Sequence, residues 1–86
     1  MGELLKLPNI GRALEAQLCG VGINSAEELK TTGSRAAWLK ILKTDDSACF
    51  NRLLSLEGAV RGIKKSLLSD ETQAELKAFY HENKRR

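Results

Sequence analysis

The chain has few of the residues that mark strands, linkers and metal sites. Of its 86 residues only 5% are aromatic, and it has one proline, one histidine and two cysteines. No run alternates apolar and polar residues over the length of a strand, which argues against a sheet. No repeat or linker divides the chain. We therefore expect one all-α domain over residues 1–86.

The two cysteines and the histidine form no recognisable site. Cys19 and Cys49 show neither CxxC spacing nor companion histidines, so no disulfide or zinc site is expected, and their apolar surroundings predict two small buried residues. His81 has no nearby cysteine or serine to activate. We predict no catalytic residue, cofactor, metal or small-molecule substrate, and hence a protein that is not an enzyme.

Long apolar runs are also missing. The segment Met1–Lys6 lacks the apolar stretch and small-residue cleavage site of a signal peptide. We expect a cytoplasmic protein without a membrane partner, and unpaired cysteines fit a reducing compartment.

The net charge of +3 is small and unevenly placed. All of the excess lies in Lys84, Arg85 and Arg86, which complement the dipole of a last helix or contact nucleic acid. Residues 29–44 carry four basic residues and no acidic one, and helical spacing places Lys40 and Lys43 together. That stretch is a candidate anion-binding face.

Apolar spacing predicts five helices. In the first, Ile10, Leu14 and Leu18 form one stripe, which ends when Gly22 takes a left-handed conformation and Ile23 packs back on Leu18. The later helices are expected to begin at polar caps: Ser25 with Glu28, Ser34, an aspartate of the Thr44–Asp46 break, and Ser69.

The fourth helix has the strongest pattern and is expected to be central. Gly58 on it leaves a gap in which another helix could approach closely. Trp38 is interpreted as core, and the last helix should turn Leu76, Phe79 and Tyr80 inward. The stripe of the fourth helix comprises Cys49, Leu53, Leu56, Val60 and Ile63.

The segment Leu7–Gly11 resembles the hairpin of a helix-hairpin-helix motif, whose loop presents backbone amides to a phosphate. Asn9 stands where that motif has its first glycine, and asparagine tolerates a left-handed backbone. We favour a structural corner, because the surroundings are acidic. The alternative is sequence-independent DNA binding, with candidate phosphate contacts at Lys6, Asn9, Ile10, Gly11, Arg12, Lys40 and Lys43.

Over most of its length the chain resembles the C-terminal domain of the TfoX/Sxy competence-regulator family. The resemblance lies in Leu7–Gly11 with its asparagine, in Gly22-Ile23 and Glu28-Leu29, in Leu56–Gly62, and in Leu68–Phe79. It implies a bacterial, cytoplasmic, helix-hairpin-helix-like domain associated with competence regulation and usually attached to an N-terminal domain. It supplies no catalytic or ligand residues.

Together these features predict a compact five-helix domain with an N-terminal helix-hairpin-helix-like segment, in which Pro8, Gly22 and Gly58 have structural roles. The function expected is that of a non-enzymatic interaction module that binds a protein partner or itself, with a role in transcriptional regulation. DNA binding through the hairpin is the alternative.

Overall fold

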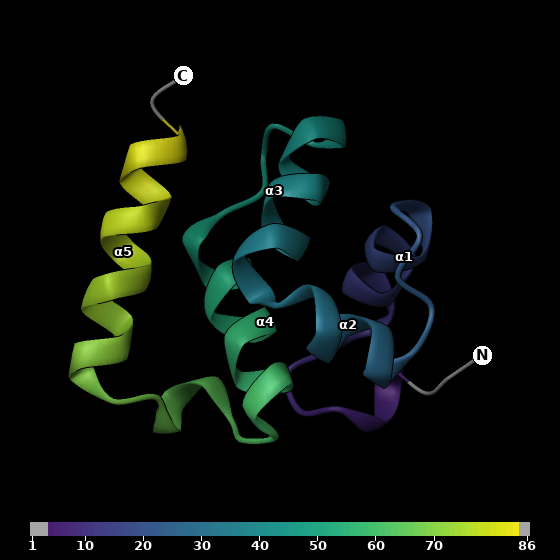
Figure 1. Ribbon diagram of the computed structural model, residues 1–86, viewed down its shortest axis with the longest axis horizontal. Coiled ribbons are helices and arrows are strands. Elements are labelled where there is room, and N and C mark those ends of the chain that lie inside the picture. Colours follow the sequence, from purple (N-terminus) through teal and green to yellow (C-terminus); the bar gives the residue numbers. More distant parts are fainter. Residues whose placement is uncertain (1–3, 85–86) are drawn as a thin grey trace.

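The structure, a computed structural model, describes residues 4–84 and consists of helices joined by short loops (Figure 1). No strand occurs among these residues, which confirms the predicted all-α class. The α-helices are α1 (Arg12–Gly20), α2 (Ala26–Thr32), α3 (Ser34–Thr44), α4 (Phe50–Arg61) and α5 (Asp70–Lys84), and two 3-10 turns are η1 (Leu4–Lys6) and η2 (Lys65–Leu67).

Helix α4 is central, as its pattern predicted. It contacts α2, α3, η2 and α5, and Figure 1 shows it between α5 on one side and α1 with α2 on the other. Five consecutive residues of this helix, Ser55–Ala59, are buried, so α4 is covered on more than one side. The stripe itself is only partly buried, since Leu53 and Leu56 are inside whereas Cys49 is exposed.

The core joins α3 to α5 through aromatic rings. Trp38 is fully buried, and its indole Nε1 donates a hydrogen bond to the main-chain oxygen of Cys49 at 3.2 Å. Its ring centroid lies 6.0 Å from that of Phe79 and 5.6 Å from that of Tyr80. The prediction that Trp38 belongs to the core is confirmed, and replacing such a residue with alanine typically costs ~3–5 kcal/mol.

The predicted ending of α1 is also confirmed. Gly22 has a φ of 89°, and the backbone amides of Gly22 and Ile23 donate to the carbonyls of Cys19 and Leu18. This is the Schellman pattern, and Ile23 and Leu18 are both buried. The helix itself begins at Arg12, two residues later than the stripe suggested, because Gly11 is its extended N-cap.

Two of the predicted serine caps are present. The hydroxyls of Ser25 and Ser69 accept hydrogen bonds from the amides of Glu28 and Thr72, each at 3.1 Å. In a complete capping box the Glu28 carboxylate would also accept a hydrogen bond from the backbone amide of Ser25. Here it accepts from the amide of Asn24, one residue earlier.

Two other predicted caps are wrong. Gly33 precedes α3, and the Ser34 hydroxyl donates to the Glu57 carboxylate instead. Cys49 stands at the N-cap of α4 without a side-chain bond, because Asp45 is held by Ser47 and Arg52 within the preceding loop.

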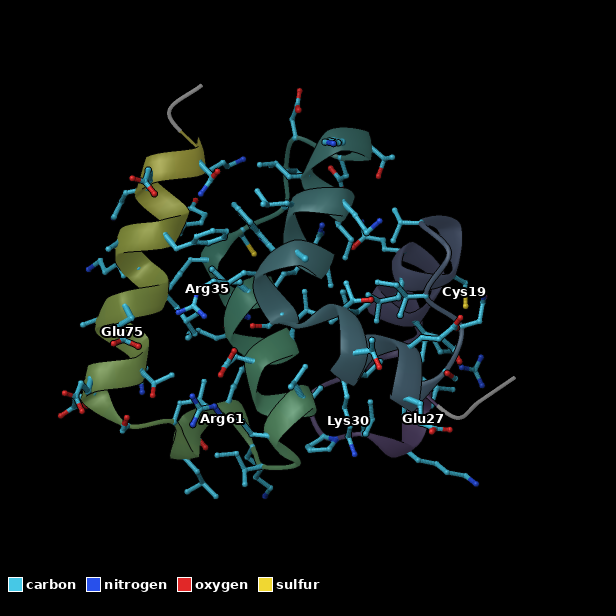
Figure 2. The ribbon with its side chains drawn as sticks, viewed as in Figure 1. Cys19, Glu27, Lys30, Arg35, Arg61 and Glu75 are labelled. Atoms are coloured by element: carbon cyan, nitrogen blue, oxygen red, sulfur yellow. The ribbon has the colours of Figure 1, made fainter. Side chains whose placement is uncertain are left out.

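The prediction that both cysteines are buried is wrong. Cys19 lies on the exposed outer side of α1 (Figure 2), and Cys49 is exposed while its neighbour Ala48 is fully buried. Helix α4 begins only at Phe50, and Cys49 is its extended N-cap, so Cys49 lies outside the helix whose stripe it was predicted to join. Within residues 4–84, every helix is too short or too polar to traverse a bilayer.

Candidate functional site

The hairpin loop forms a corner that is held from inside by Asn9. The backbone of Asn9 is left-handed, with a φ of 71°. The side-chain Nδ2 donates to the carbonyl of Ile63 at 3.0 Å, and Oδ1 accepts from the amide of Lys65 at 3.0 Å. One amide group therefore fixes the N-terminal loop to the segment between α4 and η2.

Gly58 makes this corner sterically feasible. A Cβ atom at this position would come within 2.7 Å of the Ile63 carbonyl oxygen and still closer to Asn9 Nδ2. The sequence predicted close approach at Gly58, but by another helix; the group that approaches is the Asn9 side chain with the loop after α4. We call Asn9, Gly58, Ile63 and Lys65 the Asn9 corner.

The corner separates the predicted phosphate contacts into two groups. Ile10 is buried and Asn9 is half-buried with both amide atoms bonded inside the molecule. Lys6, Gly11 and Arg12 are exposed, and the first turn of α1 receives no side-chain cap. The element before the loop is the single turn η1, since the residue before Pro8 is disfavoured in a helix.

Glu57 forms a second, buried polar cluster next to Gly58. It accepts from the Ser34 hydroxyl and from Arg61 Nε at 2.5 Å, so it ties the start of α3 to α4. Burial alone would raise the pKa of Glu57, but the bonds from Ser34 and Arg61, with the charges of Arg61 and Arg35, hold that pKa below its ordinary value. Figure 2 shows Arg35 directed toward α5, where its guanidinium lies 5.8 Å from the Phe79 ring centroid.

Asp45 organises the loop between α3 and α4. Its carboxylate accepts from the Ser47 side chain and amide, from Arg52 at 3.0 Å and from Gln17 at 2.7 Å. The bonds from Ser47 and Arg52 keep the pKa of Asp45 well below its usual range. These contacts tie the loop to Gln17 of α1 and Arg52 of α4 and occupy both oxygens of the Asp45 carboxylate.

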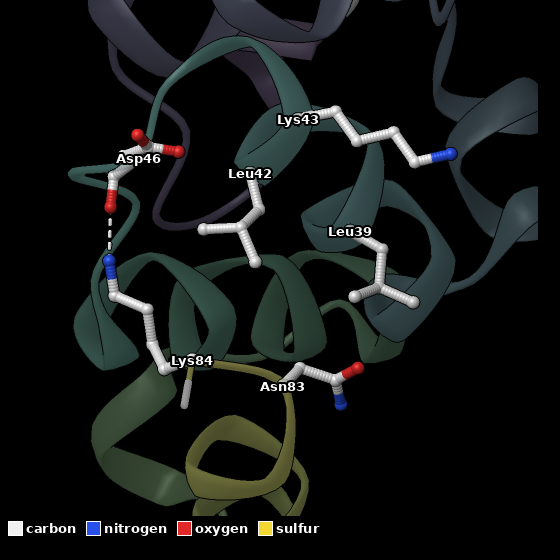
Figure 3. A pocket seen from close by; sticks show the side chains of 6 residues that line it. All are labelled: Leu39, Leu42, Lys43, Asp46, Asn83 and Lys84. Carbon is white, nitrogen blue, oxygen red and sulfur yellow. Dashed lines mark hydrogen bonds between the residues drawn. The ribbon is translucent and has the colours of Figure 1, made fainter. Parts of the chain in front are cut away.

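A pocket of about 490 Å³ lies where the last turns of α3 and α5 meet the loop after α3 (Figure 3). Its sides combine apolar and charged groups, and every one of them is half-buried or exposed. We call it the α3–α5 pocket, lined by Leu39, Leu42, Lys43, Asp46, Asn83 and Lys84.

The pocket includes one predicted anion contact and lies near another. Lys43 lines it, and Lys40 is exposed one turn earlier on the same helix. Lys40 and Lys43 therefore lie on α3, a different element from Lys6, Gly11 and Arg12 at the hairpin. No group of three potential metal ligands occurs in residues 4–84.

Comparison with known proteins gives the family. The model of the TfoX C-terminal domain matches residues 1–80. This chain belongs to the TfoX C-terminal domain family. Protein Sxy of Escherichia coli (strain K12) is 34% identical over 74 residues, which are 86% of this chain but 35% of Sxy. The chain thus spans about a third of that relative.

Solved relatives of the TfoX C-terminal domain share the fold. A crystal structure of an uncharacterized protein from Listeria monocytogenes, in a triclinic form, has a TM-score of 0.91 at 44% sequence identity. The match covers 92% of this chain and 90% of the Listeria chain. A tetragonal form of a Listeria monocytogenes protein of unknown function gives 0.90 at 44% identity, with 92% and 96% covered.

The sequence did not reveal the pocket or the Glu57 cluster. A signal for the cluster was present, because Glu57 lies between apolar and small residues of the central helix, where a carboxylate needs partners. The pocket had no comparable signal, since it joins residues about forty positions apart.

Proposed function

We propose that this TfoX C-terminal domain is a non-catalytic interaction module of the competence-regulator type, which binds a protein partner or a second copy of itself. The observation that carries the proposal is the α3–α5 pocket, in which half-buried Leu39 and Leu42 face a space of about 490 Å³ beside charged side chains. Concave, partly apolar surfaces of this kind receive anchor side chains of partners.

The hairpin supports the same proposal. The side-chain amide of Asn9, the residue that departs from the glycine of the general motif, is bonded through both of its polar atoms to Ile63 and Lys65 and so serves the fold. The loop therefore serves as a corner that ties the segment between η1 and α1 to the segment between α4 and η2.

The proposal is tested by affinity capture from bacterial extract with the immobilised domain, together with sedimentation of the purified domain over a range of concentrations. An unrelated helical domain of equal net charge is the control bait. We expect a specifically retained protein or a concentration-dependent dimer. A monomer at every concentration that retains nothing beyond the control bait contradicts the proposal.

A second candidate function is sequence-independent DNA binding at the start of α1. The observation in its favour is that Gly11 and Arg12 are exposed at a helix N-terminus without a side-chain cap, with Lys6 exposed nearby in the chain. It predicts binding of a DNA duplex that weakens between about 50 and about 200 mM salt and on Arg12→Ala.

Lys77→Ala is the matched control for that assay, because Lys77 is exposed on α5, away from the hairpin. Absence of duplex binding even at low salt, or equal weakening by Arg12→Ala and Lys77→Ala, contradicts this second function.

A further inference from the structure

The charges around the α3–α5 pocket are mostly of one sign. Helix α3 has no acidic residue between Ser34 and Thr44, and its exposed lysines include Lys40 and Lys43. On the opposite side, Lys84 lines the pocket from α5. Two ammonium groups against the single carboxylate of Asp46 leave the lining net positive.

These ammonium groups are not neutralised within the described chain. In residues 4–84 the two ion pairs are Arg52–Asp45 and Arg61–Glu57, and neither involves a pocket lysine. The Lys84 ammonium donates to the main-chain oxygen of Asp46, and Figure 3 shows the Asp46 carboxylate directed away from Lys84. Because a carbonyl has no net charge, the positive charge of Lys84 remains available to an anion.

The space between the charges is apolar. Leu39 and Leu42 are half-buried and pack against the main core, and their exposed surfaces form the apolar part of the pocket lining. The volume is at the lower end of the range typical of ligand sites, and the lining leaves it open to solvent. A free small molecule bound there would remain largely exposed to water. A side chain of a partner protein would be shielded from water by the rest of that partner.

We propose that the α3–α5 pocket binds an acidic apolar segment of a partner protein. A leucine-sized side chain of the segment rests on Leu39 and Leu42, and carboxylates beside it pair with Lys43 and Lys84. Opposite charge selects the segment and steers its approach, and the apolar contact supplies most of the affinity. This inference rests on the proposed interaction function and names the chemistry of its partner.

The first test titrates the ¹⁵N-labelled whole chain with the capped peptide Glu-Glu-Leu-Leu-Glu-Glu and follows backbone amide shifts by NMR. We expect saturable shifts at Leu39, Leu42, Lys43 and Asn83, with a dissociation constant on the order of 1 mM for so short a peptide. Peptides with lysine for glutamate, or serine for leucine, are the controls. Shifts centred elsewhere, or equal shifts with the lysine peptide, overturn the proposal.

The second test exchanges charge at the pocket. The double variant Lys43→Glu/Lys84→Glu should weaken binding of the glutamate peptide roughly tenfold. The double variant Lys64→Glu/Lys77→Glu makes the same change in net charge at exposed positions outside the pocket and should weaken it less than twofold, by roughly the screened long-range effect. Equal weakening by both pairs would show a general charge effect and overturn the proposed site.

The two proposals can fail separately. If the domain dimerises or retains a partner, and Lys43→Glu/Lys84→Glu leaves that binding unchanged, the pocket is the wrong surface but the interaction function stands. If the domain is monomeric and retains nothing beyond the control bait, the interaction function itself has failed. Circular dichroism melts of both double variants establish that a loss of binding does not reflect unfolding.

Discussion

The Asn9 corner and the α3–α5 pocket use their polar groups in opposite ways. At the corner, both atoms of one side-chain amide are bonded to the backbone of a segment far along the chain. At the pocket, Lys43 has no carboxylate partner within residues 4–84, and the Lys84 ammonium meets only a carbonyl. The comparison teaches that the side-chain amide of the hairpin motif serves the fold, whereas the pocket leaves charged groups available to another molecule.

The largest expected effect on stability breaks the corner at Gly58. Gly58→Ala places a Cβ against Asn9 Nδ2 and the Ile63 carbonyl, so backbone has to move, and we expect the free energy of unfolding to fall by about 3 kcal/mol. Urea unfolding measures it. Gly20→Ala is the control, because a Cβ at Gly20 meets nothing within 4 Å; similar losses in the two variants would contradict the tight corner.

The next effect concerns Asn9 itself. Asn9→Gly keeps the left-handed backbone without strain but removes two hydrogen bonds, and should lower the free energy of unfolding by ~2 kcal/mol. Asn9→Ala should lose more than Asn9→Gly and approach the loss of Gly58→Ala, since alanine is strained at a φ of 71°.

A double-mutant cycle sharpens this result. Gly58→Ala should cost less when Asn9 is already glycine, because the atom nearest to the added Cβ has been removed. Strictly additive losses would show that Asn9 and Gly58 do not act through one contact.

Glu57 should give the domain an acid-sensitive stability. The folded state holds the pKa of Glu57 below its ordinary value of 4.5, so its stabilising effect is present above about that pH and declines as the pH falls through the lowered value. Glu57→Gln should lower the free energy of unfolding at neutral pH by ~1–2 kcal/mol, because Arg61 loses a charged acceptor.

Urea unfolding of the wild type and Glu57→Gln between neutral and acid pH measures this dependence. The gap between the two proteins should narrow toward low pH. The residual acid sensitivity of Glu57→Gln reports the other carboxyl with a lowered pKa, Asp45. A gap that stays constant down to low pH would contradict the assignment of the charge effect to Glu57.

The smallest effect on stability is expected at the pocket. Lys43→Glu/Lys84→Glu should change the free energy of unfolding by ~1 kcal/mol or less, because Lys43 is exposed, Lys84 is only half-buried, and both contribute chiefly through the helix dipole. Thermal and urea unfolding measure it. A loss as large as that of Gly58→Ala would remove the contrast between the two regions.

The predictions that held depend on local patterns. Gly22 and Ile23 end α1 as expected because a Schellman ending is encoded within the six residues Leu18–Ile23, and Trp38 is buried because its neighbours repeat at helical spacing. The order of five helices was likewise predicted from apolar spacing and polar caps, and the structure confirms it.

The predictions that failed concern residues whose partners are distant in the sequence, or residues near a helix start that the sequence does not define. Ser34 has the local signature of a cap, but Glu57, 23 residues away, takes its hydroxyl. Cys49 continues an apolar spacing, yet Asp45 and Ser47 shape the preceding loop so that Ala48 enters the core instead. The pocket joins the ends of α3 and α5, whose meeting no single segment of sequence encodes.

The Asn9 corner also affects the rate at which the domain unfolds. Its two hydrogen bonds close a loop of 54 to 56 residues, whereas the contacts within the helices are local. Contacts across so long a separation carry a large closure entropy, so we expect these two bonds to be absent from the transition state of folding. Substitutions at Asn9 should therefore act mainly by accelerating unfolding, which makes this single side chain a determinant of the lifetime of the native state.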